Sequence, residues 1–217
     1  MALIYTADIS PSKLELVQVW APTQPWFPAG ADVELSNAGA YRVDDPDGEV
    51  GIETLLFSVG DGTEIQVPLT YRGAPLEGAE HHLITTMKHS VLGDRWVYDG
   101  AGDPVYIATT ATTVLTGKAQ AELLVAADAA GSVVRREPTA LVTSSGRETS
   151  EVPVLSVTNI AVRHDGAVTL VEAGEIRLAL ARVISDDALT SFADAATLTG
   201  TWAGHDSRVP LVAVWRA

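Results

Sequence analysis

Residues 67–106, VPLTYRGAPLEGAEHHLITTMKHSVLGDRWVYDGAGDPVY, decide the expected fold of this chain. In the middle of this stretch, apolar residues recur at the spacing of one helical face, and a glycine at position 93 suits a C-terminal stop. These apolar residues are Ala79, Leu83, Ile84, Met87 and Val91. We therefore expect a helix over residues 78–92, followed by a short strand in the aromatic segment RWVYDG.

A second helix is expected over residues 104–116. Asp103 and Pro104 suit the N-cap and the first helical position, and Gly117 suits the C-cap. The threonines of this segment have low helix propensity, but the signals at both ends are strong enough to predict the helix.

Upstream, residues 49–71 have the pattern of a β-hairpin. Two apolar runs, GIETLLFSV and EIQVPLTY, are separated by Asp61-Gly62. An Asp-Gly pair suits a type I′ turn, in which both central residues need positive φ. We expect two antiparallel strands here.

The N-terminal residues are expected to be strands and loop. Residues 2–9 and 13–20 alternate apolar and polar side chains, which predicts two strands joined by a turn at Ser10-Pro11-Ser12. Residues 21–32 are rich in proline, so we expect an irregular loop that Trp26 or Phe27 anchors on an apolar surface.

After Gly117 the pattern is strand-like almost throughout and predicts a meander of antiparallel strands. Its apolar segments are AELLVAAD, VVRREPTALVT, VPVLSVTNIAVR, AVTLVEA, EIRLALARVI, TLTGTW and VPLVAVW. Residues 144–151 are expected to form a loop, and a short helix is expected to begin at Ser185. The chain thus divides into two packed subdomains, residues 1–117 and 118–217, and its fold class is β-rich α+β.

The composition argues against several classes of function. The chain has 217 residues, and its 14 Lys and Arg against 28 Asp and Glu give a formal net charge of −14. Nucleic acids and anionic membrane surfaces both need clustered basic residues, so we expect neither as a partner. There is no cysteine for a disulfide, and no apolar run approaches the roughly 18 residues that span a bilayer. The N-terminus lacks a signal-peptide pattern, so a cytoplasmic location is expected.

The histidines of the expected helix 78–92 do not predict a metal site. His81, His82 and His89 lie opposite its apolar face. His82 and His89 share a face but lie two turns apart, about 10 Å along a helix axis, which is too far for one ion.

A polar and aromatic cluster is the candidate for ligand binding. Aromatic faces and forked guanidinium donors suit a sugar or an organic acid. The candidate residues are Arg72, His89, Arg95, Trp96 and Asp99. The alternative is architectural: Trp96 and Tyr98 pack between strand and helix, and Arg95 pairs with Asp99.

Glu80 falls within the apolar face of the expected helix. A buried carboxylate there needs a partner, which Arg72 or Arg95 would supply. The alternative is that Glu80 belongs to the first turn of the helix, where negative charge suits the helix dipole.

Motifs for catalysis are not found. SVGDGTEIQV has a strand-Gly-x-Gly-strand outline, but no lysine follows it in a position to bind nucleotide phosphates. A GxxxxGK[ST] loop, a kinase catalytic loop and a GxSxG elbow are also missing from the sequence. We therefore expect no cofactor, and an enzyme is less expected than a binding protein.

The motifs of residues 48–106 resemble a known family. GEVGIETLL at 48–56, with YRGAPL, HSVLG, RWVYDG and DPVY, resembles the N-terminal cap region of actinobacterial maltokinases. The opening LIYTADISPSKLELVQVWAPTQPWF is similar to that region as well, so the resemblance covers residues 1–117.

Maltokinases phosphorylate maltose from ATP on a two-lobed fold that is similar to protein kinases. The resemblance implies a cystatin-like cap, with the helix of residues 78–92 packed against the sheet of residues 40–71. The catalytic lobe, with its phosphate and magnesium ligands, has no counterpart in this sequence. The resemblance therefore implies neither kinase activity nor a catalytic residue.

Three hypotheses for function remain at this point. The resemblance favours a non-catalytic, stand-alone cap-like protein that binds or regulates an enzyme of trehalose, maltose or α-glucan metabolism. The first alternative is a module that binds a sugar or organic acid through the five candidate residues. The second is an unrecognised glycan-active enzyme, which would show two convergent carboxylates in a pocket. The sequence assigns no oligomeric state.

Overall fold

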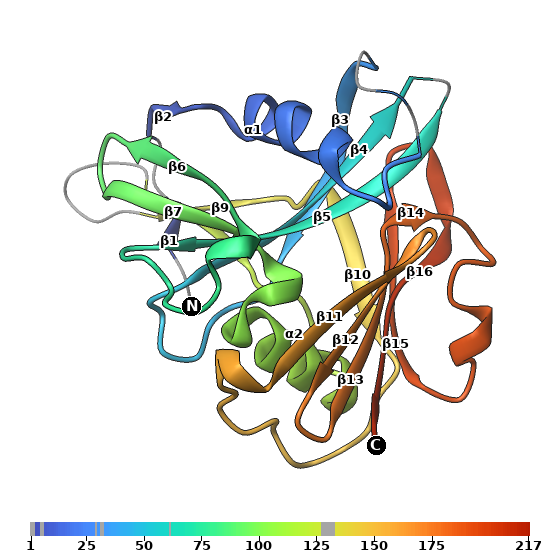
Figure 1. Ribbon diagram of the computed structural model, residues 1–217. Coiled ribbons are helices and arrows are strands. Elements are labelled where there is room, and N and C mark those ends of the chain that lie inside the picture. Colours follow the sequence, from blue (N-terminus) through green and yellow to red (C-terminus); the bar gives the residue numbers. More distant parts are fainter. Residues whose placement is uncertain (1–2, 5–6, 29, 31–32, 61, 127–132) are drawn as a thin grey trace.

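The computed structural model describes residues 3–4, 7–28, 30, 33–60, 62–126 and 133–217. In these residues the chain forms three β-sheets and two α-helices (Figure 1). The β-rich α+β class expected from the sequence is confirmed.

The largest sheet has seven strands and contains the hairpin expected over residues 49–71. Its order is β2-β6-β7-β5-β4-β3, with β14 paired to β5. The bounds are β2 (Ile9–Ser10), β3 (Leu35–Arg42), β4 (Gly51–Val59), β5 (Thr63–Arg72), β6 (Leu83–His89), β7 (Gly93–Asp99) and β14 (Val183–Ile184). The hairpin is β4–β5, and β7 is the strand expected in RWVYDG. Asp61 of the expected turn lies outside the described residues.

A six-stranded antiparallel sheet follows in the second half of the chain, but only part of it is the expected meander, because β10 pairs with β15 and β13 with β16. Its order is β10-β15-β16-β13-β12-β11, and all its strand pairs are antiparallel. The bounds are β10 (Ala140–Ser144), β11 (Ile160–Asp165), β12 (Val168–Ala173), β13 (Ile176–Ala181), β15 (Ala196–Trp202) and β16 (His205–Arg216). The expected loop over residues 144–151 is confirmed from residue 145 onward.

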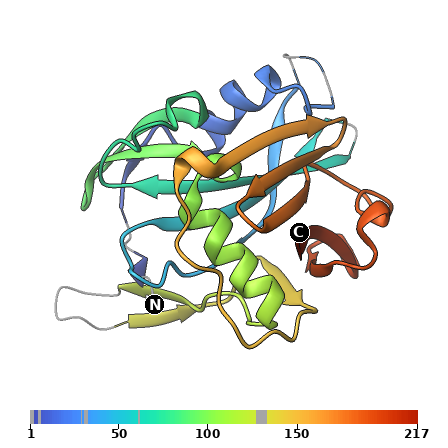
Figure 2. The same ribbon diagram turned by 60° about the horizontal axis from the view of Figure 1, so that its bottom comes forward.

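A third, three-stranded sheet lies at the side of the molecule (Figure 2). It consists of β1 (Leu3–Ile4), β8 (Leu123–Ala126) and β9 (Val133–Arg136). β1 is parallel to β8 and β9 is antiparallel to it. Residues 2, 5 and 6 of the strand expected over 2–9 lie outside the described residues, as do 127 and 128 of AELLVAAD.

Helix α2 (Pro104–Thr116) has the predicted bounds because its two ends are capped locally. The Asp103 Oδ1 atom accepts the Val105 N–H at 2.9 Å, and Gly117 adopts a left-handed conformation with φ of 71°. The other elements are α1 (Lys13–Trp20) and the short 3-10 turns η1 (Ala21–Thr23), η2 (Glu80–His82), η3 (Gly100–Gly102), η4 (Val157–Asn159) and η5 (Thr190–Phe192). The helix expected from Ser185 is only the single turn η5.

The helix predicted over residues 78–92 is wrong, because this segment forms η2 and β6. Leu83, Met87 and Val91 are four residues apart, and this interval fits one face of a strand as well as one face of a helix. Isoleucine and the two threonines at 84–86 favour a strand, and pairing with β7 fixes it. The implied packing of this helix on the sheet is also wrong, and α1 and α2 pack there instead.

The strand predicted over residues 13–20 is also wrong, since these residues form α1. Ser12 Oγ accepts the Glu15 N–H at 3.2 Å, and the Glu15 carboxylate accepts the Ser12 N–H at 2.7 Å. This capping box starts a helix despite the alternating pattern that follows. The expected loop anchor is confirmed, because Trp26 is buried.

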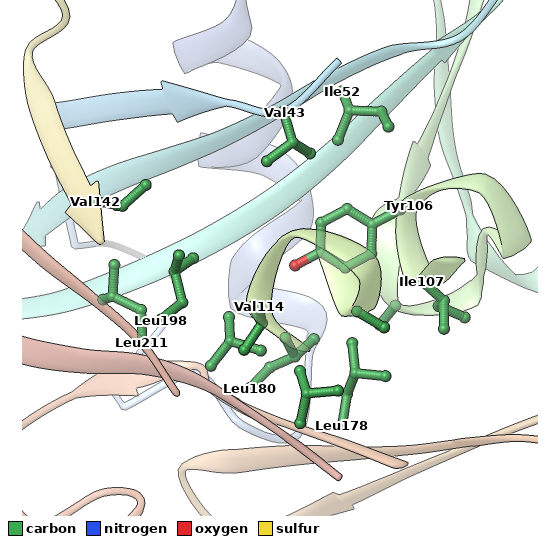
Figure 3. Close-up of a cluster of buried hydrophobic side chains, with 14 of the residues drawn as sticks. Val43, Ile52, Tyr106, Ile107, Val114, Val142, Leu178, Leu180, Leu198 and Leu211 are labelled. Atoms are coloured by element: carbon green, nitrogen blue, oxygen red, sulfur yellow. The ribbon is translucent and has the colours of Figure 1, made fainter. Parts of the chain in front are cut away.

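The seven-stranded sheet is covered on both faces, which explains its long apolar runs. Leu55 and Phe57 of β4 face α1, whereas Ile52 and Leu56 face α2. Helix α2 lies between this face and the six-stranded sheet (Figure 3). Side chains from before and after residue 118 thus share one core, and the division of the chain at that residue stays a prediction.

Gln66 joins the two large sheets in the interior. Its Nε2 atom donates to the carbonyl oxygens of Ala181 at 2.9 Å and Leu211 at 2.5 Å. Close by, Val183 of β14 lies opposite Ile65 of β5. These contacts fix how the six-stranded sheet sits against β5.

Candidate functional site

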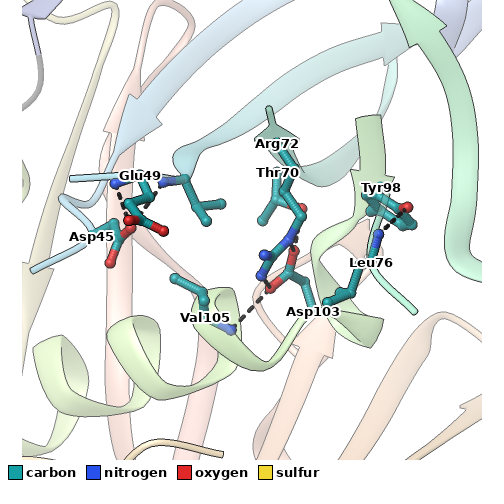
Figure 4. Close-up of polar contacts among 9 residues, drawn as sticks. Asp45, Glu49, Thr70, Arg72, Leu76, Tyr98, Asp103 and Val105 are labelled. Carbon is teal, nitrogen blue, oxygen red and sulfur yellow. Dashed lines mark hydrogen bonds and ion pairs between the residues drawn. The ribbon is translucent and has the colours of Figure 1, made fainter. Parts of the chain in front are cut away.

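The Asp103 carboxylate holds β5 to the start of α2 (Figure 4). Arg72 Nε lies 2.7 Å from Oδ2, and Arg72 Nη2 lies 2.6 Å from Oδ1. Thr70 Oγ1 donates to Oδ2 at 2.7 Å, and the Val105 N–H donates to Oδ1. Arg72, a candidate ligand-binding residue, is therefore held in a structural ion pair.

Asp99, at the end of β7, pairs with Arg182 and not with Arg95 as the architectural interpretation expected. Arg182 Nη2 lies 2.8 Å from Oδ1 and 2.7 Å from Oδ2, and both side chains are buried. Arg182 Nε donates to Thr169 Oγ1 at 2.9 Å, and the guanidinium lies 5.0 Å from the centroid of the Trp26 ring. Among the described residues, Nη1 of Arg182 has no hydrogen-bond partner.

Sequence reasoning missed Arg182, although a signal for it exists. It is a charged residue in the apolar run EIRLALARVI, and a buried charge requires a partner.

The remaining candidate residues lie nearer the β6–β7 turn. His89 ends β6, and its Nδ1 accepts the N–H groups of Val91 and Leu92. Arg95 Nη2 donates to the Leu92 carbonyl at 2.8 Å. Trp96 of β7 is paired with Arg72 on the neighbouring strand β5. Ligand binding by the five residues stays a prediction.

Glu80 is exposed and has neither of the expected arginines as an ion-pair partner among the described residues. Its carboxylate accepts the Gly78 N–H at 3.0 Å at the start of η2. The interpretation as a first-turn residue describes this position better, although the turn is 3-10 and not α-helical.

A cavity of about 230 Å³ opens beside Asp99, and we call it the histidine pocket. Segments that are distant in the sequence line it: Trp20, Gln24, His81, His82, Asp99, Ile160, Val162 and His164. The last three alternate along β11, so their side chains share one face of that strand. Of the five candidate residues, only Asp99 lines this cavity among the described residues.

Thr169 connects the histidine pocket to the buried arginine. Its Oγ1 accepts from Arg182 Nε and lies 2.9 Å from Nδ1 of His164. The rings of His81 and His82 lie 4.0 Å apart between centroids. The pocket is therefore backed by a continuous network that runs from His164 through Thr169 and Arg182 to Asp99.

The pKa values of two imidazoles of this pocket, His82 and His164, are lowered, which favours their neutral form. Burial, and after it His81, lowers the pKa of His82, with smaller contributions from Arg182 and His164. Burial and then Arg182 lower the pKa of His164, and the Asp99 carboxylate opposes both shifts. Neutral imidazoles each offer one donor and one acceptor to a ligand.

Gly102 lets the His82 ring pack against η3. A Cβ atom at this position would lie 2.0 Å from Cδ2 of His82. Gly102→Ala is therefore expected to lower the free energy of unfolding by about 1–3 kcal/mol, because the ring must move. Urea unfolding followed by circular dichroism measures this. Gly30→Ala is the matched control, since a Cβ there meets nothing within 4 Å; equal stability of the two variants would contradict the close packing.

A second cavity, of about 180 Å³, lies along α2. Its carboxylates are Asp44, Asp45, Asp47 and Glu151. Asp45 accepts the N–H groups of Asp47, Glu49 and Val50, and Glu151 pairs with Lys118. Asp45 and Glu151 are thus engaged in contacts that hold loops in place.

Neither a metal cluster nor a membrane-spanning helix is found in the part of the chain that the structure describes. Its His, Asp and Glu residues form no group of three or more that could hold a metal ion. None of its helices is long and apolar enough to cross a membrane.

One stretch of the sequence matches a known domain family, from the last residue of α1 to the N-cap of α2. Residues 20–103 match the maltokinase N-terminal cap domain. The expected resemblance to the maltokinase cap region is confirmed for these residues, which we call the cap-matched segment. No curated protein matches the chain significantly. The segment includes β3 to β7, Asp99 and Asp103, whereas α2 and the six-stranded sheet lie outside it.

Proposed function

We propose that this chain is an accessory module of maltose and α-glucan metabolism that binds an enzyme and catalyses no reaction itself. The observation that carries the proposal is the match of the cap-matched segment to a domain of maltokinases. A module of this kind would act through its surface, so its interior serves to keep that surface rigid.

The contacts of the buried carboxylates support a non-catalytic role. Glu53 binds Lys13 at 2.5 Å, and Glu64 accepts from Trp202 Nε1 at 3.2 Å. Asp99 and Asp103 are held by their arginines. A general acid or base must be able to exchange a proton with its substrate, whereas these carboxylates serve as structural acceptors.

Exposed apolar side chains in the cap-matched segment provide a contact surface. Val91 and Leu92, in the β6–β7 turn, have exposed fractions of 54% and 43%. Leu83, at the start of β6, is also exposed. The fully buried core of an interface is more apolar than its rim and is depleted of charged residues, so we assign the enzyme contact to this turn.

Binding to purified enzymes tests this proposal. The panel consists of maltokinase, an enzyme that supplies its maltose, and an enzyme that consumes its phosphorylated product. We expect the chain to bind one of them in isothermal titration calorimetry. The double variant V91D/L92D is expected to weaken that binding at least about tenfold, because two charges would be desolvated in the contact.

Val154→Asp is the matched control for this experiment. Val154 has an exposed fraction of 95% and lies outside the cap-matched segment, so its variant should bind like the parent. The proposal is rejected if no enzyme of the panel binds at micromolar concentrations. The turn is rejected as the contact if both variants bind equally well.

A further inference from the structure

The histidine pocket collects groups that can carry positive charge on a strongly acidic protein. His81 and His82 come from η2, and His164 comes from β11. Asp99 is the carboxylate among the described lining residues, and both its oxygens already bind Arg182 Nη2. The Arg182 and Asp99 charges compensate each other, so a proton gained by any imidazole makes the pocket positive.

An anion in the pocket would favour such a proton. The charged form of an imidazole is disfavoured by burial and by neighbouring positive charge, and a nearby negative charge reverses that preference. His81, His82, Asp99, His164 and Arg182 are the titratable and charged groups from η2, β7, β11 and the end of β13 that face this space or back it, and Glu80 of η2 lies near enough to His81 for the two charges to interact. Three imidazoles line the space for an anion, against the compensated Asp99 carboxylate and the exposed Glu80 carboxylate, which accepts the Gly78 N–H.

The cavity has space for more than a bare inorganic ion. Its volume of about 230 Å³ fits a small organic molecule. Trp20, Ile160 and Val162 provide apolar surface for a carbon skeleton, and the Gln24 amide provides a further polar group. The lining therefore combines anion-binding groups at the Asp99 side with apolar contact from α1 and β11.

We propose that the histidine pocket binds a small organic oxyanion, a phosphate monoester or a carboxylate, and takes up a proton on binding. Binding tightens as the pH falls, because the imidazoles must be protonated in the complex. Affinity decreases as the pH rises through the pKa values that the histidines have in the complex. The site is separate from the β6–β7 turn, so it stands or falls independently of the enzyme contact.

Calorimetry with defined probes tests the proposal. Glycerol 3-phosphate and succinate are the anionic probes, and glycerol is the neutral reference. Between about pH 5.5 and about pH 7.5, where histidine titrates, the affinity of an anion should fall by up to about tenfold per pH unit. Repeating the titration in buffers of different ionisation enthalpy measures the proton uptake directly. The tighter of the two anions identifies the phosphate or the carboxylate as the preferred group.

Histidine variants locate the site. H81Q and H82Q should each weaken anion binding at least about tenfold near pH 5.5 and flatten its pH dependence. His205→Gln is the matched control, because it removes an imidazole outside the pocket and keeps an N–H donor for the Glu64 carboxylate. Thermal melts establish that each variant is folded. If H82Q does not fold, H81Q is the deciding variant, because His81 is exposed and its substitution should not disturb the fold. The proposal is overturned if neither anion binds at millimolar concentration, if glycerol binds as well as they do, or if H81Q binds like H205Q.

Discussion

Asp99→Asn is expected to lower the free energy of unfolding by about 3–5 kcal/mol, because it leaves the charge of Arg182 buried without a counter-charge. Arg182 has no exposed surface, and Asp99 has an exposed fraction of 4%. Urea unfolding monitored by circular dichroism measures the loss.

Two further variants make this result specific. Asp94→Asn removes an exposed carboxylate 2.6 Å from Lys88, and a change of less than about 1 kcal/mol is expected there. The double variant D99N/R182M should be more stable than D99N alone, since it also removes the uncompensated charge. If D99N unfolds at the same urea concentration as D94N, the buried pair is not a main determinant of stability.

Asp103→Ala is expected to destabilise the protein by a similar amount, about 3–5 kcal/mol. The variant leaves the guanidinium of Arg72 without its carboxylate, removes the acceptor of Thr70 and takes away the N-cap of α2. Asp103→Asn should recover about 1 kcal/mol, because the amide oxygen still accepts the Val105 N–H. The same unfolding experiment compares both variants.

The control for Asp103 is another aspartate in an ion pair. Asp165 lies 3.3 Å from Arg163 with both side chains largely exposed, so Asp165→Ala should change stability by less than about 1 kcal/mol. Equal stability of D103A and D165A would contradict the role of Asp103 in joining β5 to α2. If D103A and D103N are equally stable, only the contribution of Asp103 as the N-cap of α2 is contradicted.

The helix predicted over residues 78–92 shows why the spacing of apolar residues alone does not identify an element. Leu83 and Met87 are an even number of residues apart, so both a helix and a strand place them on one face. In β6 only Met87 of this pair is buried, and the partner strand β7 lies immediately after it in the chain. Hydrogen bonds with β7 decided between the two structures, and periodicity does not contain that information.

The pocket could be predicted only in part. Asp99 was selected from its polar and aromatic neighbours, and it does line the histidine pocket. His164 and Arg182 lie in the second half of the chain, and no local pattern relates them to Asp99. His81 and His82 do not lie on a helix face as expected: they belong to the 3-10 turn η2 and line the cavity, although His81 is also exposed.

The sequence by itself determined the bounds of α2, the β4–β5 hairpin and the resemblance of residues 20–103 to the maltokinase cap. Caps and turns depend on residues within about four positions of each other, so their signals are complete in a short stretch. Only the tertiary structure decided that Asp99 meets Arg182, 83 positions away, and that three histidines surround one cavity. These contacts depend on how two sheets pack around α2. Only after that packing has buried Arg182 and Asp99 does each charge need the other as a partner.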